Sequence, residues 1–155
     1  MAMTTQAKRQ QGILIIACVL ALTLSACTSP KNVPGESLTQ EQASYLQELF
    51  TLDADESIIT YNDSYKFKTN GSFYTDKRVA GYWVGEDKSE NNLVSVYYTD
   101  IKSMTLSDLS GSLRNASFIL ITKKNGRSVQ VFVDGKSKEV ASFYDGVQRY
   151  WMGVR

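Results

Sequence analysis

Residues 117–152 read SFILITKKNGRSVQVFVDGKSKEVASFYDGVQRYWM, and this stretch decides the fold. It begins with two runs rich in β-branched and aromatic residues, 117–122 and 127–133, which is the composition of β-strands. Along the second run, alternate positions carry Val129, Val131 and Val133. The runs are separated by Lys124-Asn125-Gly126, and Asn-Gly favours the two positive φ angles of a type I′ turn. We therefore expect a β-hairpin that closes at residues 124–126.

The period of the apolar residues changes after this hairpin. From Ser137 onward they recur mostly at steps of three, or in adjacent pairs, which places them on one side of a helix: Val140, Phe143, Tyr144, Val147, Tyr150 and Trp151. Ser137 is suited to be the N-cap, and Gly153 to end the helix. Because this apolar side is wide and mostly aromatic, the helix predicted over 137–152 must cover a large surface. A curved antiparallel sheet with an open end is its natural partner.

Upstream residues predict further strands and one short helix. Strand-forming residues occupy the segments 57–61, 67–74, 78–84, 93–98 and 101–106. A short amphipathic helix is predicted over residues 39–50, because Thr39 and Gln42 have the spacing of a capping box and the apolar residues follow a helical period. The chain thus predicts a mainly β protein with helices (α+β). We expect about seven antiparallel strands capped by a C-terminal α-helix.

The N-terminus has the three parts of a secretory signal. Lys8 and Arg9 form a positive region, residues 12–24 form an apolar region of 13 residues, and small residues follow. That apolar region is shorter than the ~20 residues that a membrane-spanning helix needs. The next feature is Leu24-Ser25-Ala26-Cys27, which resembles the lipobox of bacterial lipoproteins at all four positions. An ordinary secretory signal is the alternative, but it does not account for the cysteine.

The resemblance implies that residues 1–26 are a signal peptide removed before Cys27. It also implies that Cys27 carries a diacylglyceryl thioether and an N-acyl chain such as palmitate, and two or more acyl chains anchor a protein stably in a membrane. In Gram-negative lipoproteins an Asp after the cysteine favours the inner membrane, so Thr28 indicates the periplasmic side of the outer membrane. Residues 27–37 contain both prolines of the chain and predict a flexible tether, and residues 38–155 predict one globular domain.

Composition argues against several classes of function. Removal of residues 1–26 would take away two of the 17 basic residues and leave 15 against 16 acidic ones, so no basic patch for nucleic acid is expected. The chain has no histidine, which is the commonest general base and metal ligand. Its two cysteines are Cys18, inside the leader, and Cys27. We therefore expect no catalytic residue, no metal site, no cofactor and no disulfide.

The order of elements over residues 53–152 resembles the bacterial pleckstrin-homology-like domains. The motif YTDKRV at 74–79 is similar to a hairpin common in those domains, and YTDIKSM at 98–104 is similar to their entry to a middle strand. The resemblance implies a bent barrel of two orthogonal sheets whose open corner is plugged by the C-terminal helix. It does not imply a phosphoinositide site, because the loop 62–68 holds only Lys66 and Lys68 beside an acidic residue.

Charged clusters have plainer explanations than catalysis. The carboxylates of residues 53–56 and 86–90 fall in predicted turns, so we interpret them as solvated loops and not as a glycosidase pair. Side chains of Lys77 and Arg78 should point to opposite faces of a strand, and one of them is expected to pair with Asp76 or Asp100.

Aromatic pairs on neighbouring predicted strands are the candidate binding residues. Since side chains alternate along a strand, one member of each pair must face outward, and Tyr and Trp are enriched at interfaces. The candidates are Tyr82, Trp83, Tyr97 and Tyr98.

Three hypotheses about function remain open on the sequence alone. We favour a non-enzymatic lipoprotein of the bacterial envelope that binds a protein or peptide through sheet edges and outward aromatic residues. A carrier or sensor of a small apolar or lipid ligand is the second hypothesis, and a cavity under the C-terminal helix would favour it. A hydrolase is the third, and it would require carboxylates that converge in a cleft.

Overall fold

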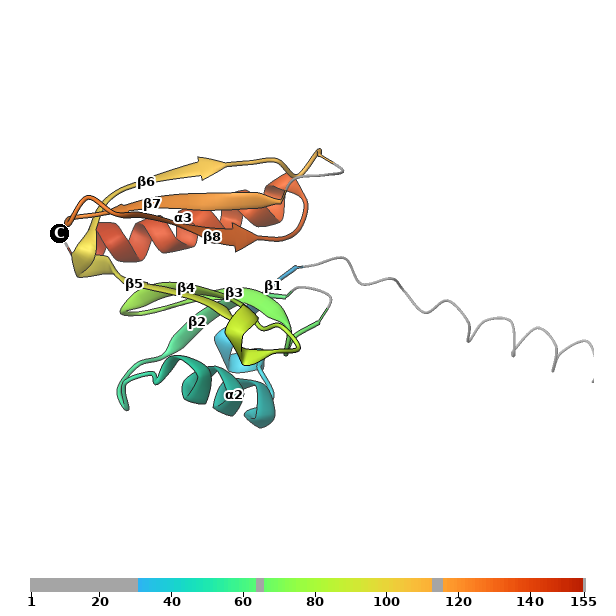
Figure 1. Ribbon diagram of the computed structural model, residues 1–155. Helices are drawn as coiled ribbons and strands as arrows, with labels where there is room; N and C mark the ends of the chain where they lie inside the picture. The colour runs from blue at the N-terminus through green and yellow to red at the C-terminus, as the bar shows by residue number, and fades with distance from the viewer. Residues whose placement is uncertain (1–30, 64–65, 113–115, 155) are drawn as a thin grey trace, which may run out of the picture.

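The computed structural model describes residues 31–63, 66–112 and 116–154. The lipobox, Cys27 and the signal segment 1–26 therefore lie outside the described residues. In the described part, eight antiparallel strands form two sheets (Figure 1). Five strands form the first sheet in sequential order: β1 (Lys31–Pro34), β2 (Ile58–Asp63), β3 (Asn70–Thr75), β4 (Arg78–Trp83) and β5 (Asn92–Tyr97). Three form the second: β6 (Ile101–Ser107), β7 (Ser117–Lys123) and β8 (Ser128–Val133).

Two α-helices cover these sheets, and short 3₁₀ helices join some of the elements (Figure 1). Helix α2 (Gln40–Phe50) lies on one face of the five-stranded sheet. Helix α3 (Ser137–Gly153) and the three-stranded sheet lie on the other face. The 3₁₀ helices are η2 (Gly35–Ser37), η3 (Lys88–Glu90) and η4 (Tyr98–Asp100). This architecture confirms the predicted α+β fold.

The capping box predicted for the first helix is present in α2. The Thr39 hydroxyl accepts a hydrogen bond from the backbone N–H of Gln42 at 3.2 Å, and the Gln42 side chain accepts one from the backbone N–H of Thr39 at 2.9 Å. Two amides at the helix start are thereby satisfied. The helix ends at Phe50, and the C-cap residue Thr51 adopts a left-handed φ of 47°. For α3 the expectation was less accurate, because the cap is Lys136 and Ser137 is the first helical residue, its hydroxyl donating to the Asp108 carboxylate.

The larger hydrophobic core lies between the two sheets and α3. Helix α3 contributes four buried side chains that are 7% exposed or less: Val140, Phe143, Val147 and Trp151. They pack against inward-facing residues of both sheets, including Tyr74, Val96 and Ile119. The ring of Phe143 meets that of Tyr74 edge-on, with 5.2 Å between ring centroids. The C-terminal helix thus closes the space between the sheets as its aromatic side predicted.

A second core lies between α2 and the opposite face of the five-stranded sheet. Leu46 of α2 is fully buried there against strand side chains of the other parity: Tyr61, Phe73, Ala80 and Tyr82. Because side chains alternate along a strand, β4 sends Val79 to the first core and Ala80 to the second. The five-stranded sheet is therefore buried on both faces over much of its area, which explains its nearly continuous apolar runs.

Strand β1 differs from the prediction of a flexible tether over residues 27–37. Lys31–Pro34 pairs antiparallel with β2, and Pro34 sits opposite Thr60. The strand was missed because it is short, lacks apolar alternation and ends in proline. Proline is tolerated here because β1 is an edge strand, whose outer side needs no ladder hydrogen bonds. The sheet thus begins four residues after Cys27.

The hairpin turn between β7 and β8 is also different from the predicted type I′ turn. Gly126 has a φ of 84°, but Asn125 does not have a positive φ. Lys123 and Arg127 are paired through the N–H of Lys123 and the carbonyl of Arg127 at 2.8 Å, which leaves a loop of three residues. This geometry matches the three-residue hairpin in which glycine takes the left-handed position and forms a bulge.

A buried ion pair fixes the start of β4, where the sequence predicted only solvated carboxylates. The Arg78 guanidinium donates to both carboxylate oxygens of Glu56, at 2.8 and 2.5 Å, and these side chains are 6% and 0% exposed. Lys77 pairs instead with Asp53 and Asp55 at the surface. Neither cation uses the expected partners Asp76 or Asp100 for a salt bridge, because the turn before β2 brings residues 53–56 over the start of β4.

None of the helices within residues 31–63, 66–112 and 116–154 is long and apolar enough to cross a membrane.

Candidate functional site

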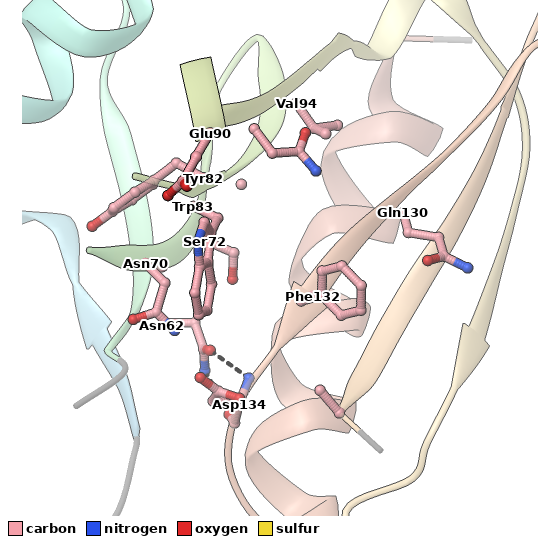
Figure 2. A pocket seen from close by; sticks show the side chains of 14 residues that line it. Asn62, Asn70, Ser72, Tyr82, Trp83, Glu90, Val94, Gln130, Phe132 and Asp134 are labelled. Carbon is pink, nitrogen blue, oxygen red and sulfur yellow. Dashed lines mark hydrogen bonds between the residues drawn. The ribbon is translucent and has the colours of Figure 1, made fainter. Parts of the chain in front are cut away.

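A cleft of about 570 Å³ separates strand β8 from the five-stranded sheet (Figure 2). On one side its lining residues come from β2, β3, β4 and β5 and from η3, which supplies Glu90. On the other side they come from β8, from Asp134 after it and from Ala116 before β7. The two walls come into contact at Gly81 of β4 and Val131 of β8. Glycine has no Cβ atom, and one added at Gly81 would lie only 3.3 Å from Cγ1 of Val131. A cleft of this size is within the range of ligand-binding pockets.

The wall formed by β8 is an unpaired strand edge. In the described part of the chain, β8 pairs with β7 alone. The carbonyl of Arg127 faces β7, since it accepts from Lys123. Backbone groups of alternate residues in an antiparallel strand point to opposite edges, so those of residues 129, 131 and 133 face β7. Those of Gln130 and Phe132 then face away from β7, and both residues line the cleft.

Asn62 confirms this alternation at the end of the edge. Its side-chain oxygen accepts from the backbone N–H of Asp134 at 2.8 Å, and its side-chain nitrogen donates to the Asp134 carbonyl at 2.9 Å (Figure 2). The same nitrogen donates to Asn32 of β1 at 2.9 Å, and Asn62 is 1% exposed. The amide of Asn62 thus pairs with β8 as a peptide group of a neighbouring strand would. The next backbone groups along this edge, at Phe132 and Gln130, face the cleft.

The floor of the cleft is polar and lacks bulk. Ser72 of β3 and Gly81 of β4 are direct cross-strand partners, and both line the cleft. Ser72 is 1% exposed, and its hydroxyl has no hydrogen-bond partner among the described residues. A buried hydroxyl without a partner costs about 1–3 kcal/mol.

The charges that line the cleft are negative. Glu90 and Asp134 lie at its two ends, with the Trp83 ring between them (Figure 2). No described residue that lines the cleft is Lys or Arg. Burial raises the pKa of the Asp134 carboxyl, because desolvation disfavours its charged form. The cleft is therefore suited to neutral or cationic groups and poorly suited to phosphate or carboxylate.

Two exposed aromatic side chains flank the cleft. Trp83 ends β4 with 55% of its surface exposed, and Phe132 is 52% exposed on β8 (Figure 2). On the outer face of the three-stranded sheet, the ring of Phe118 packs edge-on against Phe132 with 6.1 Å between centroids. Half-exposed aromatic residues beside a concave surface are typical of binding sites.

The structure divides the four aromatic residues predicted from the sequence. Tyr82 is 5% exposed under α2, and its hydroxyl donates to the carbonyl of Phe67 and bonds that of Tyr61 at 3.0 Å. Tyr98 is 2% exposed, and its hydroxyl donates to the Thr75 carbonyl at 2.9 Å. Burial raises the pKa of both phenols, and that of Tyr61 to about 12. Tyr82 and Tyr98 are therefore core residues; Tyr98 lies outside the cleft lining, whereas Tyr82 is among the residues that line the cleft.

The two outward members do not form one patch. Trp83 lies opposite Asn92 at one end of the β4–β5 pair, and Tyr97 lies opposite Arg78 at the other end. They also point to opposite faces, because Tyr97 is cross-strand partner to Arg78, which has the parity of Ala80 and Tyr82. The guanidinium of Arg78 lies 4.3 Å from the centre of the Tyr97 ring, which is a cation–π contact. Of the four, Trp83 and Tyr82 line the cleft, and Trp83 alone of these two is exposed.

No family model matches the chain, and no curated protein matches it significantly. Among solved structures, it is similar to the crystal structure of a DUF1696 family protein with a pleckstrin-homology domain from Shewanella loihica. The TM-score is 0.51 at 14% sequence identity, over 81% of this chain and 96% of the other. The fold is pleckstrin-homology-like. This similarity confirms the predicted architecture and is compatible with a binding or scaffolding module, but the fold alone does not specify a ligand.

Within the described residues, no group of three or more Cys, Asp or Glu side chains could hold a metal ion. The side chains that line the cleft carry amides, two hydroxyls, two carboxyl groups and three aromatic ring systems. It can form hydrogen bonds and bury apolar surface.

Proposed function

We propose that this protein is a non-enzymatic, membrane-anchored binding module of the bacterial envelope. It binds an extended segment of another envelope protein, which adds as a strand to β8 inside the cleft. The observation that carries the proposal is the unpaired edge of β8, whose backbone groups at Gln130 and Phe132 face a concave space flanked by Trp83.

Strand addition is a common way for small β domains to bind peptides. Backbone hydrogen bonds supply the affinity, and pockets for alternate side chains supply the specificity. The amide of Asn62 already occupies the position beyond the end of this edge. A peptide backbone would continue the same pattern along Phe132 and Gln130, and its side chains would alternate between the floor of the cleft and solvent.

The lipobox supplies the anchor in this proposal. Three residues separate Cys27 from Lys31, where β1 begins, so at most about 14 Å of extended chain lies between the lipid and the sheet. Lys31 pairs with Asp63, next to the cleft residue Asn62. A lipid on Cys27 would hold the cleft close to the bilayer surface, at the periplasmic side of the outer membrane if Thr28 acts as it does in similar lipoproteins.

Substitution of Cys27 should abolish lipidation. When cells expressing the chain grow with labelled palmitate, the wild-type protein should take up label and the Cys27→Ala variant should take up none, because the thioether forms on that sulfur. The Cys18→Ala variant is the matched control, since it removes the other cysteine of the chain and should keep the label. Equal labelling of the wild type and Cys27→Ala would refute the lipid anchor.

Loss of one backbone N–H should weaken peptide binding through β8. Peptides selected from a random display library on the full chain in detergent should bind the Gln130→Ala variant with wild-type affinity. They should bind Gln130→Pro about tenfold more weakly, because proline removes one edge donor and leaves a peptide carbonyl unsatisfied. The measurement is fluorescence anisotropy of the selected peptides.

A second proline variant, Val131→Pro, tests the direction of the edge without a ligand when it is compared with Gln130→Pro. Gln130→Pro should leave the β7–β8 ladder intact, whereas Val131→Pro should destabilise the protein strongly, since the N–H of residue 131 faces β7. Selected peptides that bind Gln130→Pro as tightly as the wild type would place their site elsewhere. Failure to select any peptide would reject the proposed function.

The structure gives less support to the two alternatives. Side chains of α3 fill the space under that helix, where a carrier of an apolar ligand would need its cavity. A hydrolase would need carboxyl groups that flank one bond, and Glu90 and Asp134 stand at opposite ends of the cleft (Figure 2).

A further inference from the structure

The hydroxyl of Ser72 points to a polar group in whatever fills the cleft. Ser72 lies on the floor, it is 99% buried, and the described residues provide no partner for its oxygen. Its cross-strand partner Gly81 has no side chain that could cover it from the neighbouring strand. A hydroxyl can donate one hydrogen bond and accept two. A ligand group that reaches the floor would therefore bind more tightly if it carried a hydrogen-bond donor or acceptor.

The charges decide between a donor and an acceptor. Glu90 and Asp134 line the same cleft, and neither forms a salt bridge within the described part of the chain. An anionic or purely accepting group would meet these carboxylates without a cation to offset them. A cationic donor would bond to the Ser72 hydroxyl and neutralise a carboxylate at the same time, and hydrogen bonds between charged groups are the stronger ones.

The geometry of strand addition brings a side chain to this floor. Val131 and Val133 of β8 point toward the five-stranded sheet, and Val131 lies against the position of Gly81. A strand added beside β8 continues the pleat of the sheet, so alternate side chains of the new strand point the same way. One such side chain would therefore extend toward Ser72, between Trp83 and the end of β8.

We infer that the segment bound by β8 carries a lysine or arginine whose side chain enters the cleft, bonds to the Ser72 hydroxyl and pairs with Asp134. This inference rests on the proposed function, since it specifies the segment that the β8 edge binds. It makes the partner an extended, basic stretch of an envelope protein and excludes an acidic peptide.

The test uses four synthetic peptides of alternating Thr and Val, identical except for one central Val position that carries Lys, Gln, Glu or Leu. Affinity for the full chain in detergent is measured by fluorescence anisotropy. The Lys peptide should bind about tenfold more tightly than the Gln peptide, because a charge-assisted hydrogen bond replaces a neutral one, and the Glu peptide should bind most weakly.

In the Asp134→Asn variant the affinity of the Lys peptide should fall to that of the Gln peptide. Asp87→Asn is the matched control, because it makes the same change of charge outside the cleft lining and should preserve the preference.

Ser72→Ala separates a ligand-binding hydroxyl from a structural one. The variant should weaken binding of the Lys peptide, and it should raise the urea midpoint of the free protein, because an unpartnered buried hydroxyl is removed. A lower urea midpoint would mean that the hydroxyl has a structural partner and would overturn its role in binding.

The outcomes distinguish this inference from the proposed function. If the four peptides bind equally well and Gln130→Pro weakens all of them, strand addition stands and the basic side chain is refuted. A preference for the Leu peptide would likewise refute it. If no peptide binds the wild-type chain, both the inference and the proposed function fail.

Discussion

Replacement of Glu56 by alanine should lower the free energy of unfolding by about 3–5 kcal/mol, which is the usual cost of removing one partner from a buried ion pair. The loss should appear in urea unfolding of the purified protein as a lower midpoint with little change in slope. Small domains are stable by about 5–15 kcal/mol, so this one substitution would leave a marginal fold.

The size of the effect follows from what Glu56 satisfies. Its carboxylate accepts hydrogen bonds from Nε and from a terminal nitrogen of Arg78. It also accepts one from the Thr75 hydroxyl at 2.7 Å and one from the Asp53 N–H at 3.1 Å. Without it, the guanidinium would keep a partner in Asp53 at 3.9 Å and the ring of Tyr97. Neither replaces a bidentate carboxylate, so most of a buried charge would be left uncompensated.

Asp55→Asn is the matched control for Glu56→Ala. Asp55 bonds Lys77 at 2.6 Å, but its side chain is 81% exposed, and surface ion pairs contribute about 0–1 kcal/mol. A second comparison uses the double variant Glu56→Ala with Arg78→Met, which removes the unpaired charge. It should be more stable than Glu56→Ala alone. Equal losses for Asp55→Asn and Glu56→Ala would mean that the Arg78–Glu56 pair contributes no more to stability than a surface ion pair.

The sequence predicted those parts of the fold that follow from local rules. The capping box of α2 needs only Thr39 and Gln42, three residues apart, and the apolar side of α3 needs only the helical period. The alternation of Val79 and Ala80 between two faces likewise depends on the strand itself. In each case the information lies within one element, so the pattern is sufficient.

The features that were missed depend on residues far apart in the chain. Nothing near Lys31–Pro34 indicates a strand, since the strand with which it pairs in the described part of the chain is β2, almost thirty residues later. Glu56 belongs to a polar turn by composition, and only the approach of Arg78 buries it. The turn at Asn125 follows a local pattern that fits two hairpin types, and the register of β7 with β8 selects the three-residue loop.

The sequence could predict that aromatic residues face outward, but it could not predict where the cleft lies. Alternation requires one outward residue in each aromatic pair, yet it cannot say that Trp83 reaches a cleft and Tyr97 reaches Arg78. The free edge of β8 depends on how the two sheets pack against each other. At that contact the side chain of Asn62 bonds the backbone of Asp134, which is 72 residues away in the sequence. A sequence rule exists only for the weaker statement that a terminal strand of a sheet has an open edge.

Replacement of Phe143 by alanine should lower the free energy of unfolding by about 3–5 kcal/mol, because a large buried ring is lost and a cavity remains. Phe143 is fully buried at the middle of α3 and packs edge-on against Tyr74 of the five-stranded sheet. Phe143→Leu should cost less, since most of the apolar volume is kept. Met152→Ala on the same helix is the matched control, because Met152 is 53% exposed and should change stability by no more than about 0.5 kcal/mol.

This series also tests how the sheets are held together. The larger core joins residues of both sheets to α3, so the cost of a cavity at Phe143 measures the packing that keeps the two sheets in their relative positions. A loss of less than about 1 kcal/mol in Phe143→Ala would contradict tight packing of α3 between the sheets. It would mean that side chains around position 143 relax to fill the cavity. A loss as large as expected would mean that α3 is tightly packed between the two sheets, whose separation beside β8 forms the cleft.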